Sequence, residues 1–383
     1  MCFLNKVYVT AYSVISALGA GNDETYKSLS ENKKGIYFPD KSEKFQKPFF
    51  PINYDFNINN DITLSAKLAL TLLSFIEKNW LELSPIPIFM ATSTGGIKET
   101  EEVYKHLRSS NKKYNLGEKY YFYDIFNSIK EKYKDKIPEA YTFSTACSAS
   151  GHSIFHAYRY IKNGIIDKAI VLGMDALSIT TNFGFDSLKL VSEKGTRPLT
   201  LDRDGLSLGE GGAIILLESN PSAKPIAEIA GVASNSDGYH ITSPNPEGIQ
   251  QRACINNSIK EAGITPDDID YINAHGTGTP TNDEIEINVI KSIFTNKPPV
   301  TSLKGFIGHT VGSSAIIELA ICLEMLKHKK IFQQENMNNP IDEELIPKTT
   351  IEKNVKYFLK NSFGFGGNNV SMVIKTLFQE GPL

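Results

Sequence analysis

Two patterns of hydrophobic and polar positions alternate along the chain. Short apolar runs, such as residues 86–92 and 168–174, end at Gly, Pro or charged residues, which is typical of buried β-strands. Between them lie longer stretches, such as residues 64–80, in which apolar residues recur every three or four positions, as in a helix that buries one face. The predicted strands are residues 7–10, 86–92, 141–144, 168–174, 213–218, 226–234, 269–273, 300–304, 356–362 and 370–374. The predicted helices are residues 23–29, 64–80, 98–107, 152–162, 248–262 and 315–326.

The order of elements in the first half of the chain is repeated in the second. A strand, a Thr-Gly turn and an acidic helix follow one another near residue 92 and again near residue 273. Each set is followed by a further strand, a turn of small residues and an apolar helix. This repetition indicates an internal duplication. Alternating strands and helices predict mostly parallel sheet covered by helices on both faces.

Two segments show no clear period. Residues 32–62 are polar, aromatic and contain Pro, and we expect a loop there. Residues 108–138 are charged and rich in Tyr, and their pattern favours a solvated helix with loops.

Composition narrows the class of protein. The chain has 383 residues, 41% apolar and 22% charged, which is ordinary for a globular protein. A net charge of −3 is too small to indicate a nucleic-acid partner or an acidic membrane face. Four scattered cysteines predict no disulfide framework. The longest apolar stretch, residues 68–76, is far below the roughly 20 residues of a membrane span, and the first residues lack a signal-peptide pattern. We therefore expect a cytoplasmic protein without a membrane span.

Cys147 is the strongest candidate for chemistry. It stands in Thr145-Ala146-Cys147-Ser148-Ala149-Ser150-Gly151, between a predicted strand and a predicted helix. Unpaired N–H groups at a helix N-terminus favour a thiolate over a thiol, so this position predicts a nucleophile. The alternative is that Cys147 is a small packed side chain without a catalytic role.

Two histidines provide candidate partners for this cysteine. His275 and His309 each follow a predicted strand and stand in turns of small residues, His275-Gly276-Thr277-Gly278 and Gly308-His309-Thr310-Val311-Gly312. Functional residues favour such strand ends in α/β folds. Cys with His is an arrangement of nucleophile and base.

Three further features carry an open alternative. Lys304 and Glu318 flank His309 and are either an ion pair that orients the site or unrelated surface charges. The glycine-rich turn at residues 363–369 supplies N–H groups for an oxyanion hole with the N–H of Cys147, or is a plain hairpin turn. His152 and His156 have a spacing that suits a metal, but no third ligand is evident, so we expect core or interface histidines and no metal site.

Taken together, these motifs resemble the β-ketoacyl-acyl-carrier-protein synthases, the decarboxylating condensing enzymes of the thiolase superfamily. The resemblance covers most of the chain and is closest to the elongating class, which combines a cysteine with two histidines. The motifs that carry it are Thr145-Ala146-Cys147-Ser148, Arg203-Asp204-Gly205, Ser236-Asp237-Gly238-Tyr239-His240, Asn273-Ala274-His275-Gly276-Thr277, residues 304–309 and Asn361-Ser362-Phe363-Gly364-Phe365-Gly366-Gly367.

The resemblance implies a duplicated, five-layered α-β-α-β-α thiolase fold with two mixed, mostly parallel sheets. Residues 1–220 would form an N-terminal half that carries the cysteine, and residues 221–383 a C-terminal half that carries both histidines. It also implies a dimer that acts on acyl- and malonyl-loaded carrier protein. No cofactor is implied, because phosphopantetheine arrives on the carrier protein.

The resemblance also assigns roles to individual residues. Cys147 would receive the acyl chain, and His275 and His309 would promote decarboxylation of malonyl-carrier-protein. The N–H groups of Cys147 and Phe365 would form the oxyanion hole. The remaining implied roles are support of the site by Lys304 paired with Glu318, contact with the phosphopantetheine arm by Thr277 and Thr279, and gating of the acyl pocket by Phe185 and Phe365.

The chain departs from the fatty-acid enzymes before the cysteine, where residues 113–141 lack their usual Gly-Pro and small-residue helix. In this respect the chain is more similar to the compact synthases of aryl-polyene or flexirubin-type pathways. The same similarity is found in Thr92-Ser93-Thr94-Gly95-Gly96 and in the residues after His275 and Phe365. The sequence leaves open a homodimer or a heterodimer with a paralogue resembling a chain-length factor.

There are two alternatives to a condensing enzyme, a non-catalytic chain-length-factor-like subunit and a CoA-dependent thiolase. Subunits of the first kind usually lack the cysteine, and the set of one Cys and two His argues against the second.

Overall fold

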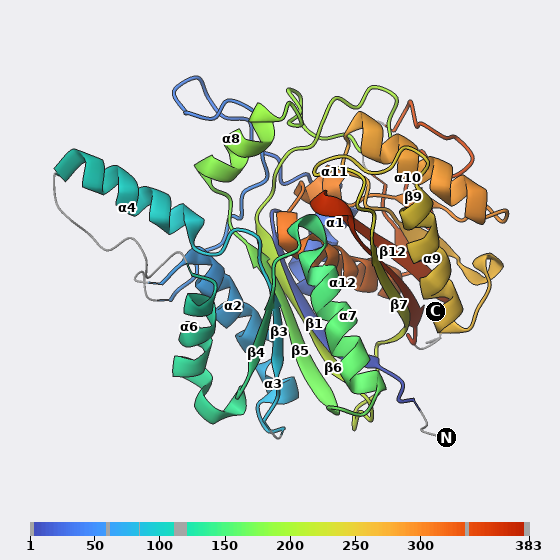
Figure 1. Ribbon diagram of the computed structural model, residues 1–383, viewed down its shortest axis with the longest axis horizontal. Coiled ribbons are helices and arrows are strands. Elements are labelled where there is room, and N and C mark those ends of the chain that lie inside the picture. The colour runs from blue at the N-terminus through green and yellow to red at the C-terminus, as the bar shows by residue number, and fades with distance from the viewer. Residues whose placement is uncertain (1–3, 59–61, 84, 111–120, 334–336, 379–383) are drawn as a thin grey trace.

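The computed structural model describes the chain except residues 1–3, 59–61, 84, 111–120, 334–336 and 379–383 (Figure 1). Its main feature is an 11-stranded sheet made of two sets of strands. The first set is β1 (Tyr8–Ser16), β2 (Gly19–Ala20), β3 (Ile88–Ala91), β4 (Ala140–Phe143), β5 (Lys168–Asp175) and β6 (Gly211–Glu218). The second set is β7 (Ala227–Ser236), β8 (Tyr271–Asn273), β9 (Val300–Thr301), β12 (Tyr357–Gly364) and β13 (Asn368–Thr376). A separate two-stranded sheet pairs β10 (Lys330–Ile331) with β11 (Ile351–Glu352).

The two sets of strands have the same topology. Their spatial orders are β4-β3-β5-β6-β1 and β9-β8-β12-β13-β7, so in each set the strands follow the same permutation of chain order. The sets meet through antiparallel pairing of Tyr8 and Val9 with Glu228 and Ala227. The duplication expected from the sequence is therefore present in the topology.

Parallel pairing is limited to the outer strands of each set, namely β3 with β4 and β5, and β8 with β9 and β12. The inner pairs β5–β6, β1–β6, β12–β13 and β7–β13 are antiparallel. The strand pairing is mixed, as expected, but the expected excess of parallel pairs is wrong. The two expected sheets are joined into one through β1 and β7. For one of these antiparallel pairs the physical reason is local: β12 and β13 are joined by a short hairpin turn, which permits only antiparallel pairing.

Helices separate and cover the two sets of strands, which gives five layers (Figure 1). One hydrophobic cluster surrounds the central helices α7 (Ala149–Lys162) and α12 (Ser314–Lys327) and includes residues of both sets. A second lies beneath α2 (Leu64–Phe75) and α6 (Tyr123–Tyr133), and a third beneath α9 (Ile249–Ala262) and α10 (Pro280–Ile293). The other helices of four or more residues among those described are α1 (Asn22–Ser30), α3 (Glu77–Trp80), α4 (Ile97–Ser110), α8 (Ile179–Ser187) and α11 (Lys304–Ile307).

The surroundings of strand β6 explain why its sequence is apolar throughout. Ile215 and Leu217 face the central cluster, whereas Ile214 and Leu216 face the cluster beneath α2 and α6. A strand that is buried on both faces has no polar alternation. The same holds for α12, which is surrounded by protein and buries its glutamates as well as its apolar residues.

Several predicted elements differ from the structure. The single helix expected at 64–80 is broken at Ile76 into α2 and α3. Helix α6 is not solvated on all sides, because Ile125, Ile129 and Tyr133 pack in the core; part of the 108–138 segment lies outside the described residues. Helix α8 is not predicted by the sequence, because its residues, ITTNFGFDS, have no helical apolar period.

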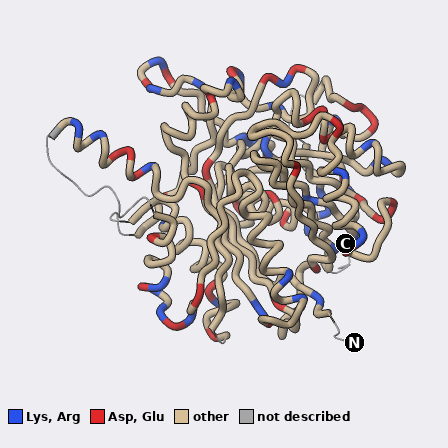
Figure 2. Tube along the Cα trace, viewed as in Figure 1, with Lys and Arg blue, Asp and Glu red and all other residues tan. Residues whose placement is uncertain are grey.

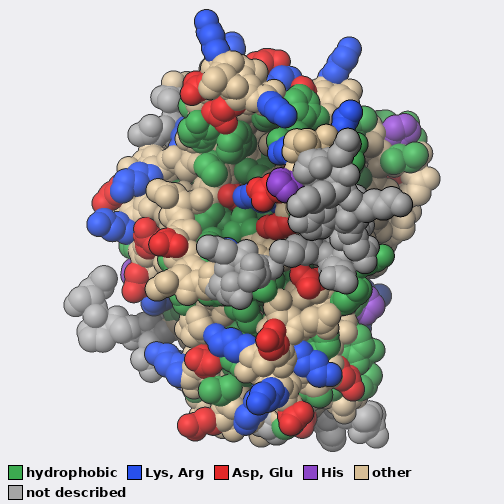
Figure 3. Space-filling model, turned by 90° about the vertical axis from the view of Figure 1, so that its left-hand side faces the viewer, with side chains coloured by type: hydrophobic (Ala, Val, Ile, Leu, Met, Phe, Trp, Pro, Cys, Tyr) green, Lys and Arg blue, Asp and Glu red, His purple; other side chains and the backbone are tan. Residues whose placement is uncertain are grey.

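Charged residues lie mainly at the ends of strands and on outer helices (Figure 2). On the face shown in Figure 3, acidic and basic side chains are interspersed, in keeping with the small net charge. None of the helices in the described part of the chain is long and apolar enough to cross a membrane.

Candidate active site

Cys147 lies in a tight turn, the 3-10 helix η2 (Ala146–Ser148), between β4 and α7. Ala146, directly before it, has a φ of 51°, which costs an L-residue about 1–2 kcal/mol. Val311 has a φ of 47° at the start of η4 (Val311–Ser313), which precedes α12 in the second half. The duplicated turns therefore share the same strained first residue, and the strain in the first turn positions the thiol.

The thiol of Cys147 is 3% exposed. Burial raises its pKa to about 11, although the Lys304 charge and the backbone N–H groups of Phe365 and Cys147 itself act in the opposite direction. The expectation of a thiolate at the helix N-terminus is therefore wrong for the free protein, because desolvation outweighs the local dipoles. The two N–H groups that lower this pKa are those of Cys147 and Phe365, the same two that are expected from the sequence in an oxyanion hole.

His275 follows β8, and hydrogen bonds to the backbone of its turn fix its position. The N–H groups of His275 and Gly276 donate to the two oxygens of Glu286 in α10, at 2.8 and 2.9 Å. The Lys304 ammonium donates to the carbonyl oxygen of His275 at 2.6 Å. The amide of Asn361 donates to Glu286 at 3.1 Å, which ties this turn to β12. The imidazole is thus placed by three backbone contacts.

His309 lies on the other side of the site. Its backbone N–H donates to the carbonyl of Ser207. Its ring Nδ1 lies 2.9 Å from the hydroxyl of Ser314 at the start of α12. The rings of His275 and His309 meet edge to face, with centroids 5.6 Å apart. Burial, then the charge of Lys304, holds the pKa of both imidazoles well below its usual value. Both rings are therefore neutral at physiological pH.

The structure brings Lys304 and Glu318 together in the core, with Nζ 2.5 Å from Oε1. The alternative of two surface charges is excluded, since Lys304 is 0% exposed. A second lysine, Lys360 of β12, contacts the other oxygen of Glu318 at 2.8 Å.

The cysteine and both histidines line one pocket of about 270 Å³. Thr277 and Thr279 line it as well, with their hydroxyls 2.9 Å apart. Phe185 and Phe365 stack across it with ring centroids 5.7 Å apart. Lys304 and Glu318 are absent from this lining; Lys304 contacts the pocket residue His275 through its backbone carbonyl.

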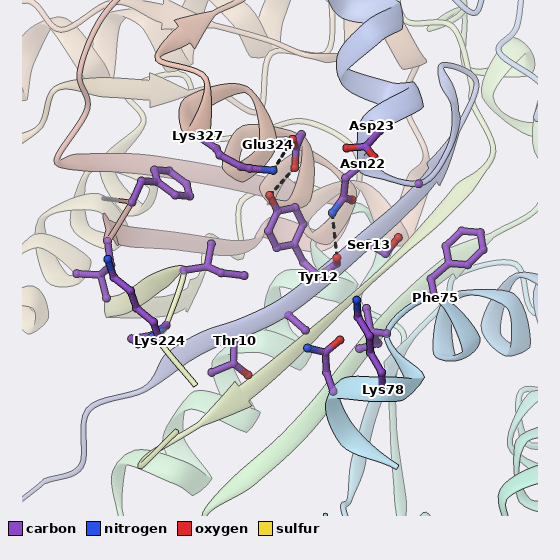
Figure 4. A pocket seen from close by; sticks show the side chains of 18 of the residues that line it. Thr10, Tyr12, Ser13, Asn22, Asp23, Phe75, Lys78, Lys224, Glu324 and Lys327 are labelled. Carbon is purple, nitrogen blue, oxygen red and sulfur yellow. Dashed lines mark hydrogen bonds and ion pairs between the residues drawn. The ribbon is translucent and has the colours of Figure 1, made fainter. Parts of the chain in front are cut away.

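A larger hollow of about 830 Å³ lies at the junction of the two sets of strands (Figure 4). Its floor includes Tyr12, whose hydroxyl donates to buried Glu324 at 2.6 Å. No Cys or His is among the described residues that line it. The smaller pocket is the candidate active site because the candidate residues Cys147, His275 and His309 all line it.

The remaining histidine pair has structural contacts. His152 lies within hydrogen-bond distance of the Thr145 hydroxyl and the Ser148 carbonyl through Nδ1, at 3.0 and 3.1 Å, and of the Ser234 hydroxyl through Nε2, at 3.0 Å. His156 stacks on Phe143. The two therefore serve the packing of α7.

Three residues of the site, Glu286, Asn361 and Lys360, are not predicted by the sequence. Glu286 belongs to an acidic helix that resembles a solvated surface, and Asn361 is a polar residue near the end of a strand. A lysine is unusual within a strand that is predicted to be buried, and this feature of the sequence could have identified Lys360.

Comparisons with known proteins identify the family of this chain. It matches the family models "Beta-ketoacyl synthase, N-terminal domain" over residues 138–223 and "Beta-ketoacyl synthase, C-terminal domain" over residues 226–338. It is 29% identical to 3-oxoacyl-[acyl-carrier-protein] synthase 2 of Coxiella burnetii, over 97% of this chain and 99% of that protein. It is 36% identical over 250 residues, 60% of each chain, to the protein of the same name from Synechocystis.

Among solved structures, a chain from the complex of the ketosynthase ApeO with its chain length factor ApeC, from Xenorhabdus doucetiae, matches with a TM-score of 0.87. It is 28% identical, and the match covers 97% of this chain and 98% of that one. The neighbour therefore shares the whole thiolase-type fold. Since both halves match the family and relatives align over the full length, the chain belongs to the β-ketoacyl synthase family, the acyltransferases that condense acyl- and malonyl-carrier-protein in fatty-acid or polyketide synthesis.

Proposed function

We propose that Cys147 carries the acyl chain as a thioester and that His275 and His309 drive decarboxylation of malonyl-carrier-protein. The observation that carries this proposal is that one pocket holds a cysteine with two N–H groups on its sulfur and two neutral imidazoles. Each of these groups suits one step of a decarboxylative Claisen condensation.

In the first step, the sulfur of Cys147 attacks the thioester carbonyl of the acyl-carrier-protein. The N–H groups of Cys147 and Phe365 bind the oxyanion, and the carrier-protein thiol leaves with the proton that Cys147 gives up. Because burial holds Cys147 as a thiol, this proton has to leave as the bond forms, and the departing sulfur of the carrier protein accepts it.

In the second step, His275 and His309 donate N–H groups to the thioester oxygen of the malonyl group. The bond to the carboxylate breaks, carbon dioxide leaves, and the electron pair forms an enolate. Donors aimed at a developing oxyanion contribute about 3–4 kcal/mol each. The enolate carbon then attacks the acyl thioester, and the sulfur of Cys147 leaves.

The other pocket residues receive supporting roles. Thr277 and Thr279 contact the phosphopantetheine arm, so the protein needs no cofactor of its own. Phe185 and Phe365 gate the acyl pocket, an assignment supported by their stacking across it.

The partner is an acyl carrier protein, and the assembly is a dimer, with itself or with a paralogue resembling a chain-length factor. The heterodimer is supported by the complex of ApeO with its chain length factor, to which this chain is similar. We place the chain in the compact aryl-polyene-type subgroup on the basis of the Thr92–Gly96 turn and the segment before Cys147. A non-catalytic subunit is disfavoured because Cys147 and both imidazoles share one pocket.

The test is product formation from a panel of short, long and polyenoyl carrier-protein thioesters with malonyl-carrier-protein, read by mass spectrometry. A 3-oxoacyl product that is lost in Cys147→Ala supports the proposal, and the preferred donor identifies the subgroup. Absence of product from every donor, with and without candidate partner subunits, would overturn it.

A further inference from the structure

Glu318 contacts two lysines, one at each carboxylate oxygen. Its Oε1 accepts a hydrogen bond from Lys304, whereas its Oε2 forms an ion pair with Lys360 that lacks hydrogen-bond geometry. Lys304 reaches it from α11 and Lys360 from β12. Lys360 also donates to the carbonyl of Asn361 at 2.6 Å. In the described part of the chain, these are the only two lysines with buried side chains, both 0% exposed.

The second lysine is not needed to neutralise Glu318. Burying an ammonium group is unfavourable unless nearby groups compensate it, and one Lys–Glu pair already balances its own charges. A second buried carboxylate, Glu286, accepts N–H bonds from His275, Gly276 and Asn361. Asn361 directly follows Lys360 in β12, so the strand that supplies the extra cation also binds this second anion.

These charges surround the two histidines. The titratable groups that contact or act on His275, His309 or Lys360 are Glu286 of α10, Lys304 of α11, and Glu318 and Cys322 of α12. Cys147 of η2 lines the same pocket as the two histidines. Lys360 acts on both imidazoles and lowers the pKa of each, in addition to the effects of burial and of Lys304.

We propose that Lys360 is a positioning residue for decarboxylation, an inference that rests on the function proposed above. It fixes Glu318, and through Glu318 it holds Lys304 against the carbonyl of His275. It also supplies a second buried positive charge behind the two imidazoles, which favours the negative oxygen that forms between them.

The structure offers a clean perturbation. Lys360→Met removes the charge but leaves Glu318 paired with Lys304, so no carboxylate loses its only partner. Lys360→Gln removes the charge and keeps a hydrogen-bond donor near Glu318, and it replaces the Met variant if that variant does not fold. Lys291→Met is the matched control, because Lys291 pairs with Asp342 at 2.7 Å on the surface, away from the pocket.

The assay is the rate of carbon dioxide release from malonyl-pantetheine as a function of pH. We expect the acid limb of both Lys360 variants to move upward by about one pH unit, because removing a nearby positive charge lets the imidazoles protonate more easily. We also expect the plateau rate to fall roughly tenfold, as the enolate oxygen loses a favourable charge. Lys291→Met should match the wild type in both respects.

The outcomes separate the two proposals. If the wild-type chain releases carbon dioxide but both Lys360 variants keep its plateau and its acid limb, the role of Lys360 is overturned and the proposed function stands. A change in thermal stability alone, without movement of the pH profile, also overturns the role of Lys360, since a purely structural lysine would behave in that way. A wild-type chain that releases no carbon dioxide overturns both proposals.

Discussion

Glu286→Gln is the substitution that best tests how the catalytic turn is built. The carboxylate accepts three N–H bonds, from His275 and Asn361 on one oxygen and from Gly276 on the other. A glutamine oxygen can keep the first two, but its NH₂ group then faces the N–H of Gly276, donor against donor. The variant therefore loses a charge-assisted bond and leaves a buried N–H unpaired.

A hydrogen bond to a charged group contributes about 1.5–3 kcal/mol, and a buried unpaired donor costs about 1–3 kcal/mol. Removing a buried charge offsets part of this, and we expect a net destabilisation of about 2–4 kcal/mol. The catalytic effect should be selective. Because His275 moves with its turn, its imidazole no longer donates to the oxyanion. We therefore expect the decarboxylation rate to fall by about two orders of magnitude, the usual effect of losing one oxyanion donor. Acylation of Cys147 should change little, because its oxyanion donors come from other turns.

The assay combines urea unfolding at fixed protein concentration with separate rates of acylation and decarboxylation. Glu284→Gln is the control, since Glu284 lies two residues earlier on the same helix and is exposed. The reasoning is refuted if Glu286→Gln and Glu284→Gln have the same stability and the same decarboxylation rate.

Two further predictions concern the other members of the site. Ser314→Ala removes the hydroxyl 2.9 Å from Nδ1 of His309, and decarboxylation should fall roughly tenfold as the ring loses its orientation, with acylation unchanged; equal loss of both rates would contradict this. Because burial raises the pKa of Cys147 to about 11, alkylation by iodoacetamide should accelerate about tenfold per pH unit from neutral to mildly alkaline pH; a rate that levels off near neutrality would indicate a preformed thiolate and contradict the assignment.

Much of the site could be predicted from the sequence because its residues stand in short, distinctive turns. Cys147 and His275 each follow a strand end, and His309 follows β9 after the short helix α11. The duplicated strand order brings these three segments to one pocket. The resemblance to condensing enzymes then predicted the fold that the topology and the comparisons support.

Burial explains what could not be predicted from the sequence. The protonation of Cys147 depends on how completely the fold removes water from it, which no local pattern encodes. Glu286 resembles an ordinary surface charge until the helices and strands around it are assembled, and the sequence does not show which buried groups compensate the charge of Lys360. Helix α8 has no helical apolar pattern. Its N-terminus is capped by the Ser178 side chain, which accepts from the N–H of Thr181, and by Glu101, which accepts from the N–H groups of Ile179 and Thr180.

The most direct test of the central claim is the intact mass of the protein after incubation with acyl-carrier-protein. We predict one acyl adduct per chain, located on Cys147, absent in Cys147→Ala, and lost when malonyl-carrier-protein is added. An adduct on another residue, an adduct that survives malonyl-carrier-protein, or no adduct with any donor or partner subunit would contradict the assignment of Cys147 as the nucleophile of a condensing enzyme.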